Sequence, residues 1–308
     1  MNNFNGFMKF AVTGGAGFVG NNIVRLLISK GHSVVVIDNL HTGKKENLED
    51  ILEEIQFYNL DIRDIKKIEP ILKEVDGIFH EAALTIVQES FHKEKEYYDV
   101  NVTGTENIFK IAKEFKKKVV FASSSSIYGD SKQIPIKEDS KRIPINPYGQ
   151  TKLEDEFLAE KYANEGLNVI GLRYFNIFGK GQTGSYAGVI TQFMRKLNDK
   201  QSPIIFGNGS QIRDFIHVSD IAEANLCAML SKTNFGFFNI GTGIETKIIN
   251  LAKIIIKIFE EQYEPVFQDP LQGDVKSSQA DIIFTEKILK WKSKISLEEG
   301  LKKLLLNN

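Results

Sequence analysis

The first half of the chain alternates short β-branched runs with stretches in which apolar residues recur three or four positions apart. The runs include KFAV (9–12), VVVI (34–37) and KVVFA (118–122), and the segment FVGNNIVRLLISK (18–30) has the helical pattern. Such alternation is typical of βαβ units, whose strands pair in parallel. Because KFAV and VVVI lack polar alternation, helices should cover both faces of the sheet. The sequence therefore predicts an α/β fold with a doubly wound parallel sheet.

The second half of the chain is less regular and reads as a smaller, mixed α/β part. The glycine-rich segment FGKGQTGSYAG (178–188) marks a boundary or a crossover. Beyond it we expect a helix at Val189–Asn198, short strands in PIIFG, DFIHV and FFNIG, and helices near 249–261 and 297–305. These patterns predict one domain at 1–175, to which segments near 212–245 could return, and a second at 176–308.

Composition narrows the classes of partner and compartment. A chain of 308 residues, 42% of them hydrophobic, can bury a sizeable core. Its 39 basic and 40 acidic residues argue against nucleic acid or an anionic membrane as the main partner. Cys227 is the single cysteine, so no disulfide forms within the chain and no cysteine-based metal site is available. Since we see neither a signal peptide nor a bilayer-spanning run, we expect a cytoplasmic protein without a metal.

A glycine-rich turn joins the first predicted strand to the first predicted helix. The segment TGGAGFVG supplies Gly14, Gly17 and Gly20. Glycines here let the backbone turn tightly and let a pyrophosphate approach the amides at the helix N-terminus. Asp38 ends the second strand about 20 residues further on, where a carboxylate can bind the adenosine ribose and would repel a 2′-phosphate. We therefore expect the first domain to be a Rossmann domain that binds NAD rather than NADP.

Two further features point to catalysis. The serines Ser123 to Ser126 follow KVVFA, at the strand end where ligands bind in open parallel sheets. Downstream, NPYGQTK places Tyr148 and Lys152 four residues apart, on one face of a helix. Tyrosine, with an ordinary pKa near 10, is a poor base at neutral pH, but a nearby ammonium group favours its phenolate. The spacing alone is common on exposed helices, yet after a glycine turn and a serine loop it predicts a catalytic pair.

Together these motifs resemble the extended short-chain dehydrogenase/reductase superfamily, and within it the NAD-dependent epimerase/dehydratase family. The resemblance continues through LDIRD (60–64), HEAA (80–83) and NVTGT (101–105) and covers nearly the whole chain. It implies that Ser124 is the catalytic hydroxyl that acts with Tyr148 and Lys152. It also implies that NAD is bound by Gly14, Gly17, Phe18, Val19, Gly20, Asp38, Asn39, Thr42, Gly43, Asp61, Ile62, Ala82, Ala83, Asn101, Ser123, Tyr148 and Lys152.

The residues after Ser124 separate the reactions known in this family. Its 4,6-dehydratases carry Asp-Glu at the positions of Ser125 and Ser126, because eliminating water requires a carboxylic acid, and its decarboxylases typically carry glutamate at position 126. The serines favour redox chemistry at C4 alone. The resemblance thus implies an NAD-dependent epimerase that inverts C4 of a UDP-hexose such as UDP-glucose or UDP-galactose, or of the N-acetylated pair. A dehydratase, a decarboxylase and a non-catalytic NAD-binding regulator are the alternatives.

The resemblance also suggests where the nucleotide sugar binds. It implies substrate contacts from Ser124, Ser125, Asn176, Val189, Phe206, Arg213 and Ser278. Arg213 would hold the diphosphate through its guanidinium group, with a salt bridge to Asp214 as the alternative. Leu271 stands where the family usually has a second diphosphate-binding arginine, and the small Ser278 would leave room for an acetamido group. Family members usually dimerise through two helices, here the one after Tyr98 and the one that carries Tyr148, so we expect a homodimer.

Overall fold

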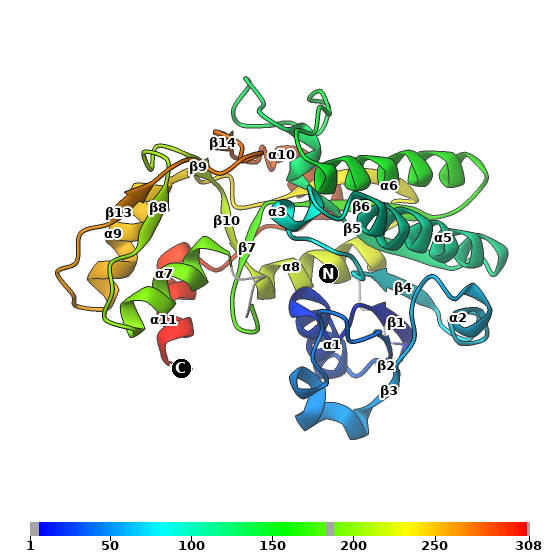
Figure 1. The fold of residues 1–308 in the computed structure, drawn as a ribbon. Coiled ribbons are helices and arrows are strands. Elements are labelled where there is room, and N and C mark those ends of the chain that lie inside the picture. The colour runs from blue at the N-terminus through cyan, green and yellow to red at the C-terminus, as the bar shows by residue number, and fades with distance from the viewer. Residues whose placement is uncertain (1–5, 183–187, 307–308) are drawn as a thin grey trace.

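A computed structural model describes residues 6–182 and 188–306, and Figure 1 shows the arrangement of its elements. Seven strands form one sheet in the order β11-β6-β5-β4-β1-β2-β3, and every neighbouring pair is parallel. These strands are β1 (Lys9–Thr13), β2 (Ser33–Ile37), β3 (Ile55–Tyr58), β4 (Gly77–His80), β5 (Lys118–Ser124), β6 (Val169–Tyr174) and β11 (Phe235–Ile240). The predicted fold class, a doubly wound parallel sheet, is confirmed. Because β11 pairs with β6, the sheet includes a strand from beyond residue 175.

Helices cover both faces of this sheet, as the unbroken apolar runs predicted. Alternate strand residues enter opposite cores: Phe10 and Val12 belong to one cluster, and Ala11, between them, belongs to the other. The first cluster lies under α1 (Phe18–Ser29) and α8 (Val218–Leu230). The second lies under α2 (Ile65–Leu72), α5 (Gly104–Glu114) and α6 (Pro147–Asn164).

A smaller unit with a core of its own lies at one end of the sheet (Figure 1). Phe193 and Leu251 are buried in this third core, which joins three helices to short strands. The predicted helix at Val189–Asn198 is present with those bounds. The elements of this part are α7 (Val189–Asn198), α9 (Ile248–Ile258), α11 (Leu297–Leu306), β7 (Asn176–Phe178), β8 (Ile204–Phe206), β9 (Ile212–Arg213), β10 (Phe215–His217), β12 (Thr246–Lys247), β13 (Val266–Gln268) and β14 (Ser277–Ser278). Helix α10 (Ile283–Leu289) instead packs on the main sheet, where Leu289 enters the first core and Thr285 donates a hydrogen bond to the Asn239 carbonyl of β11. Part of the predicted boundary segment, residues 183–187, lies outside the described residues.

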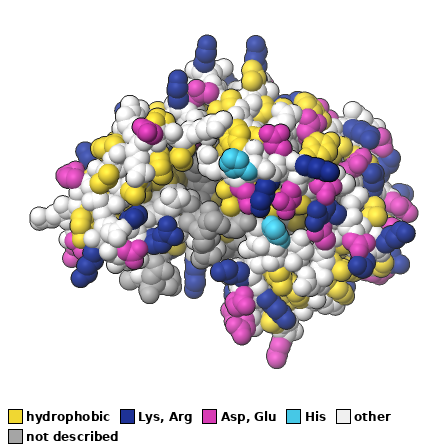
Figure 2. All heavy atoms as spheres, in the orientation of Figure 1, with side chains coloured by type: hydrophobic (Ala, Val, Ile, Leu, Met, Phe, Trp, Pro, Cys, Tyr) yellow, Lys and Arg dark blue, Asp and Glu magenta, His cyan; other side chains and the backbone are white. Residues whose placement is uncertain are grey.

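The remaining elements are short and lie in the connections: η1 (Lys45–Glu54), α3 (Val87–Ser90), α4 (Glu94–Tyr98), η2 (Asp99–Thr103) and η3 (Ser125–Tyr128). On the face seen in Figure 2, acidic and basic side chains are interspersed, in keeping with a net charge of -1. In residues 6–182 and 188–306, no helix is long and apolar enough to cross a membrane, and no three His, Cys, Asp or Glu side chains are grouped to hold a metal ion.

Candidate active site

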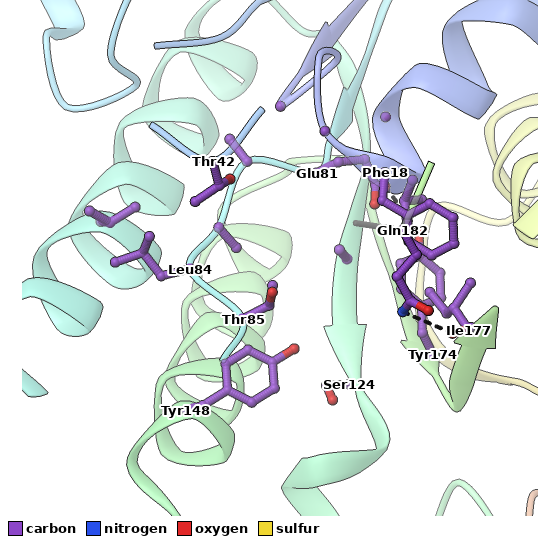
Figure 3. A pocket seen from close by; sticks show the side chains of 18 of the residues that line it. Phe18, Thr42, Glu81, Leu84, Thr85, Ser124, Tyr148, Tyr174, Ile177 and Gln182 are labelled. Carbon is purple, nitrogen blue, oxygen red and sulfur yellow. Dashed lines mark hydrogen bonds between the residues drawn. The ribbon is translucent and has the colours of Figure 1, made fainter. Parts of the chain in front are cut away.

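A cavity of about 460 Å³ runs along the carboxyl ends of the central strands. Its wall includes Gly14 after β1, Asp38 after β2, Glu81 after β4, Ser124 at the end of β5 and Tyr174 at the end of β6. In a parallel sheet these ends meet at one edge, so residues far apart in the sequence come together. Figure 3 shows the part of the cavity between Tyr148 and Tyr174.

The glycine turn provides a cradle of bare backbone at one wall of the cavity. Gly14 has φ +67°, and a Cβ there would lie 2.7 Å from the Ala82 nitrogen. A Cβ on Gly20 would lie 2.2 Å from the Gly14 carbonyl oxygen, so only glycine allows this close packing of helix on turn. The N-cap of α1, Gly17, supplies no side-chain acceptor. The first-turn amides therefore remain suited to a phosphate, which fits the predicted dinucleotide.

The loops after β2 and β3 form the far end of the cavity. Asp38 accepts hydrogen bonds from the Ala16 amide at 2.9 Å and the Leu40 amide at 2.8 Å, and its burial raises the pKa of the carboxyl. Asp61 is held by Arg63, which keeps the pKa of Asp61 well below its usual range. Five predicted cofactor residues line this end: Asp38, Asn39, Thr42, Asp61 and Ile62. Gly43 is outside the lining; a Cβ there would lie 2.9 Å from Asp38 Oδ2, so it acts by packing against that carboxylate.

The segment after β4 also contributes to the wall, through Ala82 and Ala83. The preceding His80 is buried between the hydroxyls of Thr13, at 2.7 Å, and Thr105, at 2.9 Å. Burial lowers the pKa of His80 to about 3, so it is a neutral, satisfied strand-end histidine. Asn101, a predicted cofactor residue, does not line the cavity. Its amide instead bonds both backbone groups of Leu84, at 2.8 and 3.0 Å, which braces this segment.

The serine loop and helix α6 bring the predicted catalytic residues to the same cavity. Helix α6 begins with Pro147, and Asn146 caps it by accepting a hydrogen bond from the Gly149 amide at 2.8 Å. This places Tyr148 in the first turn, and Figure 3 shows its ring across the cavity from Ser124. The Ser124 hydroxyl oxygen accepts from the Ser126 amide at 3.1 Å, which leaves its proton free to donate.

Ser123 and Lys152 complete this end of the cavity. Ser123 donates to Glu156 at 2.7 Å and thereby ties the loop to α6. Lys152 is buried, which by itself would lower the pKa of its ammonium group. The carboxylate of Asp155 and the negative charge of Tyr148 in its phenolate form outweigh that effect, so the pKa of Lys152 lies above its ordinary value. A stable cation thus stands behind Tyr148, as the predicted chemistry requires.

The predicted substrate residues divide into two groups. Ser124, Ser125, Asn176 and Val189 line the cavity, whereas Phe206, Arg213 and Ser278 do not. Phe206 is in β8, paired with β13, while Arg213 and Ser278 face each other in the pairing of β9 with β14. These three are therefore carried by the short strands of the smaller unit.

The alternative partner proposed for Arg213 is wrong. Its guanidinium group pairs with Asp274 rather than with the adjacent Asp214. Asp214 is instead occupied by backbone amides of Thr242 at 2.8 Å, Gly243 at 2.8 Å and Ala280 at 3.2 Å. Asp214 lies between β9 and β10, where these amides and the Thr242 hydroxyl occupy its carboxylate.

Two lining residues to which no sequence motif gives a role, Glu81 and Tyr174, are bonded to each other. The Tyr174 hydroxyl lies 2.9 Å from Glu81 Oε1, and both residues are labelled in Figure 3. The position of Glu81 directly after a buried strand signals that it reaches the ligand-binding edge. No local pattern identifies its partner, because the two residues are 93 positions apart.

The fold and the cavity define a dinucleotide-binding enzyme of the α/β class. The family model described as the NAD dependent epimerase/dehydratase family matches residues 10–241. The chain belongs to this family, and its cofactor is NAD. Each element of the cavity described above, from the glycine cradle to the Asp38 loop, fits that group.

Individual relatives within the family differ in their reactions. The structure of UDP-glucose 4-epimerase from Thermotoga maritima, solved with UDP-glucose, matches with a TM-score of 0.91 and 36% identity over 96% of each chain. The UDP-N-acetylglucosamine 4-epimerase of Methanobrevibacter ruminantium, in complex with UDP-N-acetylmuramic acid, matches with a TM-score of 0.92 and 34% identity over 98% of this chain and 99% of the other. A UDP-N-acetyl-alpha-D-glucosaminuronate decarboxylase of Bacillus cytotoxicus is 33% identical over 96% of this chain and 95% of its own.

Proposed function

We propose that this enzyme is a 4-epimerase of UDP-hexoses. The observation that carries the proposal is the serine loop: Ser124, Ser125 and Ser126 line the cavity near Tyr148 without a carboxylic acid among them. The acids that do line the cavity lie elsewhere, on the segments after other strands and on α4: Asp38, Asp61, Glu81 and Glu96. Elimination of water needs an acid beside the leaving hydroxyl. The loop therefore supports chemistry confined to C4, which the two 4-epimerase structures also favour.

In this proposal, three residues handle the proton of the sugar O4 hydroxyl. Bound NAD supplies reversible two-electron oxidation of the sugar carbon. Tyr148, as phenolate, accepts the proton of the hydroxyl, and Ser124 donates a hydrogen bond that orients the reacting oxygen. Lys152 stays cationic and favours the phenolate throughout. Once the 4-keto sugar has turned over, its other face would receive the hydride that the cofactor returns to C4, and Tyr148 gives the proton back to O4.

The nucleotide should remain anchored while the sugar turns. Asn176 and Val189 line the cavity where β7 and α7 begin, on the side of the smaller unit. Binding energy from the nucleotide can hold the reactive intermediate in place. We propose that Arg213 engages the diphosphate by exchanging its present partner Asp274. Ser278 lies beside Arg213 in the sheet and outside the cavity lining, so tolerance of N-acetylated sugars rests on the resemblance alone.

The test is product analysis with the purified enzyme and NAD. UDP-glucose, UDP-N-acetylglucosamine and UDP-glucuronate are each incubated and followed by NMR. A C4 isomer supports the proposal, whereas a 4-keto-6-deoxy sugar indicates a dehydratase and released carbon dioxide a decarboxylase. If no product forms from any of the three substrates, a non-catalytic regulator is favoured.

A single substitution tests the assignment of Tyr148 as the general base. Tyr148→Phe should lower the epimerisation rate by at least about a thousandfold, because general-base catalysis contributes roughly that factor. The exposed tyrosine of α4 provides the matched control, since Tyr98→Phe removes the same atom outside the cavity. A Tyr148→Phe enzyme with a rate near that of the wild type would show that another group is the base.

A further inference from the structure

Glu81, Tyr174 and Asn225 form a chain of hydrogen bonds at one wall of the cavity. The Asn225 amide nitrogen, on α8, donates to the Tyr174 hydroxyl oxygen at 2.7 Å. An amide nitrogen can only donate, so the proton of Tyr174 is left for Glu81 Oε1 at 2.9 Å. Within the described part of the chain, the other oxygen of Glu81 makes no hydrogen bond. Glu81 is thereby fixed through one oxygen while its side chain lines the cavity.

The elements packed around Glu81 offer it little compensating positive charge. Its neighbours Tyr174 of β6 and Asn225 of α8 carry no positive charge, and neither does Phe18 of α1, which lines the same cavity. Helix α6 contributes Tyr148 and the cation Lys152, but Lys152 is already paired with Asp155. The other charged or titratable groups of the lining lie on the loops after β2 and β3 and on α4: Asp38, His41, Lys44, Asp61, Arg63 and Glu96.

This setting favours the neutral form of the Glu81 carboxyl. Burial raises the pKa of Glu81 to about 8, although the Tyr174 hydrogen bond and the Lys152 cation act in the opposite direction. A carboxyl of that kind is protonated at neutral pH. Arrival of a positive charge in the same cavity would favour ionisation, and the oxidised nicotinamide ring carries such a charge. The reduced ring is neutral and does not favour ionisation of Glu81.

We propose that Glu81 is the counter-charge for the oxidised cofactor, a neutral acid in the free enzyme that gives up its proton as NAD⁺ binds. The O–H bond of Glu81 breaks, its electron pair stays on the carboxylate, and the proton passes to solvent. No oxidant or reductant takes part. The residue thus favours NAD⁺ over NADH and keeps the enzyme in the state that can oxidise a substrate. This inference does not depend on which sugar reaction the enzyme catalyses, and it is tested without a sugar.

The test counts the protons released when the dinucleotide binds. The full chain, freed of bound cofactor, is titrated with NAD⁺ near neutral pH by calorimetry in buffers of different ionisation enthalpy. Since Tyr148 is a second group that could lose a proton, the comparison is made in the Tyr148→Phe background, with and without Glu81→Gln. Glutamine keeps an acceptor for Tyr174, and melting curves establish that both variants are folded.

Tyr148→Phe should release close to one proton per NAD⁺, whereas Tyr148→Phe/Glu81→Gln should release none. As the pH rises toward the pKa of the free acid, the Kd for NAD⁺ of Tyr148→Phe should fall about tenfold per pH unit. The Kd of Tyr148→Phe/Glu81→Gln should not change over the same range. NADH should release no proton from either variant. Equal release from both variants, or equal release with NADH and NAD⁺, would overturn the proposal.

Two further measurements keep the proposal testable if glutamine disturbs the fold. Infrared difference spectra of the Tyr148→Phe chain should show loss of a protonated-carboxyl band on addition of NAD⁺, and an unchanged band contradicts the proposal. Adding Tyr174→Phe removes the hydrogen bond that favours the carboxylate, so the pH range of proton release should move upward. An unmoved range means that Glu81 is not the source of the proton.

Discussion

Lys152 and Asp155 form an ion pair within helix α6, with Nζ 3.1 Å from Oδ2 and both side chains buried. The two residues are three positions apart, so they share one face of the helix. The pair gives the lysine beside Tyr148 a counter-ion that does not depend on any ligand. The cation is therefore in place before cofactor or substrate binds.

Removing the Asp155 counter-ion should lower the free energy of unfolding. Asp155→Asn leaves the Lys152 cation buried beside a neutral amide, and breaking a buried pair from one side costs about 3 kcal/mol of the free energy of unfolding. Urea unfolding provides the measurement. Glu154→Gln, one position earlier on the same helix, alters a carboxylate that accepts a hydrogen bond from Gln150 at 2.8 Å, and it should change stability by less than about 0.5 kcal/mol. Equal losses of stability in the two variants would mean that the Lys152–Asp155 pair contributes no more than the Glu154 carboxylate does.

The buried His80 should make stability fall in mild acid. Because the folded-state pKa of about 3 lies below the ordinary 6.5, the contribution of neutral His80 is complete above 6.5 and is lost as the pH falls toward 3. Between about pH 7 and about pH 5, the free energy of unfolding should drop about 2 kcal/mol more in the wild type than in His80→Gln. Urea midpoints at each pH give both slopes. Parallel slopes would show that His80 takes up no extra proton on unfolding.

Gly14→Ala should abolish tight NAD binding. The substitution adds both a disfavoured positive φ and a contact of 2.7 Å with the Ala82 nitrogen, so the turn must open. Gly166→Ala is the matched control, since Gly166 has φ +96° but no atom within 4 Å of an added Cβ. We expect the control to lose about 1 kcal/mol of stability and keep its NAD affinity. Equilibrium titration with NAD measures the Kd of each variant, and urea unfolding measures its stability. An unaltered Kd in Gly14→Ala would contradict the proposed cradle.

Arg213→Gln should weaken UDP binding at least about tenfold, because a charge-assisted hydrogen bond to phosphate contributes roughly 1.5 kcal/mol or more. Calorimetric titration with UDP measures the effect, and uridine, which lacks the diphosphate, should bind both proteins alike. Arg195→Gln alters an exposed arginine of α7 and should leave the Kd unchanged. If Arg213→Gln bound UDP as tightly as the wild type, Arg213 would have only its structural partner, Asp274.

We predict a homodimer that uses the helix after Tyr98 and helix α6. Phe157 on α6 is 44% exposed, so its ring is available for contact with a second copy of the chain. Phe157→Glu should shift the protein to a monomer in analytical ultracentrifugation. Ile283→Glu changes an exposed residue of α10, outside these two helices, and should not alter the sedimentation of the protein. A wild-type chain that sediments as a monomer would refute this prediction.

Much of the fold and the catalytic end of the site could be predicted because the signals are local. The glycine turn, Asp38 and the serine loop each follow an apolar strand directly, and parallel strands bring their carboxyl ends to one edge whatever the loops contain. Tyr148 and Lys152 share a helix face through their spacing alone. Alternating strands and helices favour a parallel sheet, and the shared edge of that sheet brings this helix and the serine loop to one cavity.

Contacts between distant side chains were settled only by the packing of the folded chain. Glu81 meets Tyr174 across 93 positions, and Arg213 meets Asp274 across 61. Each pair depends on which strands are neighbours and on how a helix or loop lies over them, and no local periodicity carries that information. For the same reason no local pattern shows that Arg213 and Ser278 are partners in the pairing of β9 with β14, or that Phe206 lies in a strand paired with β13.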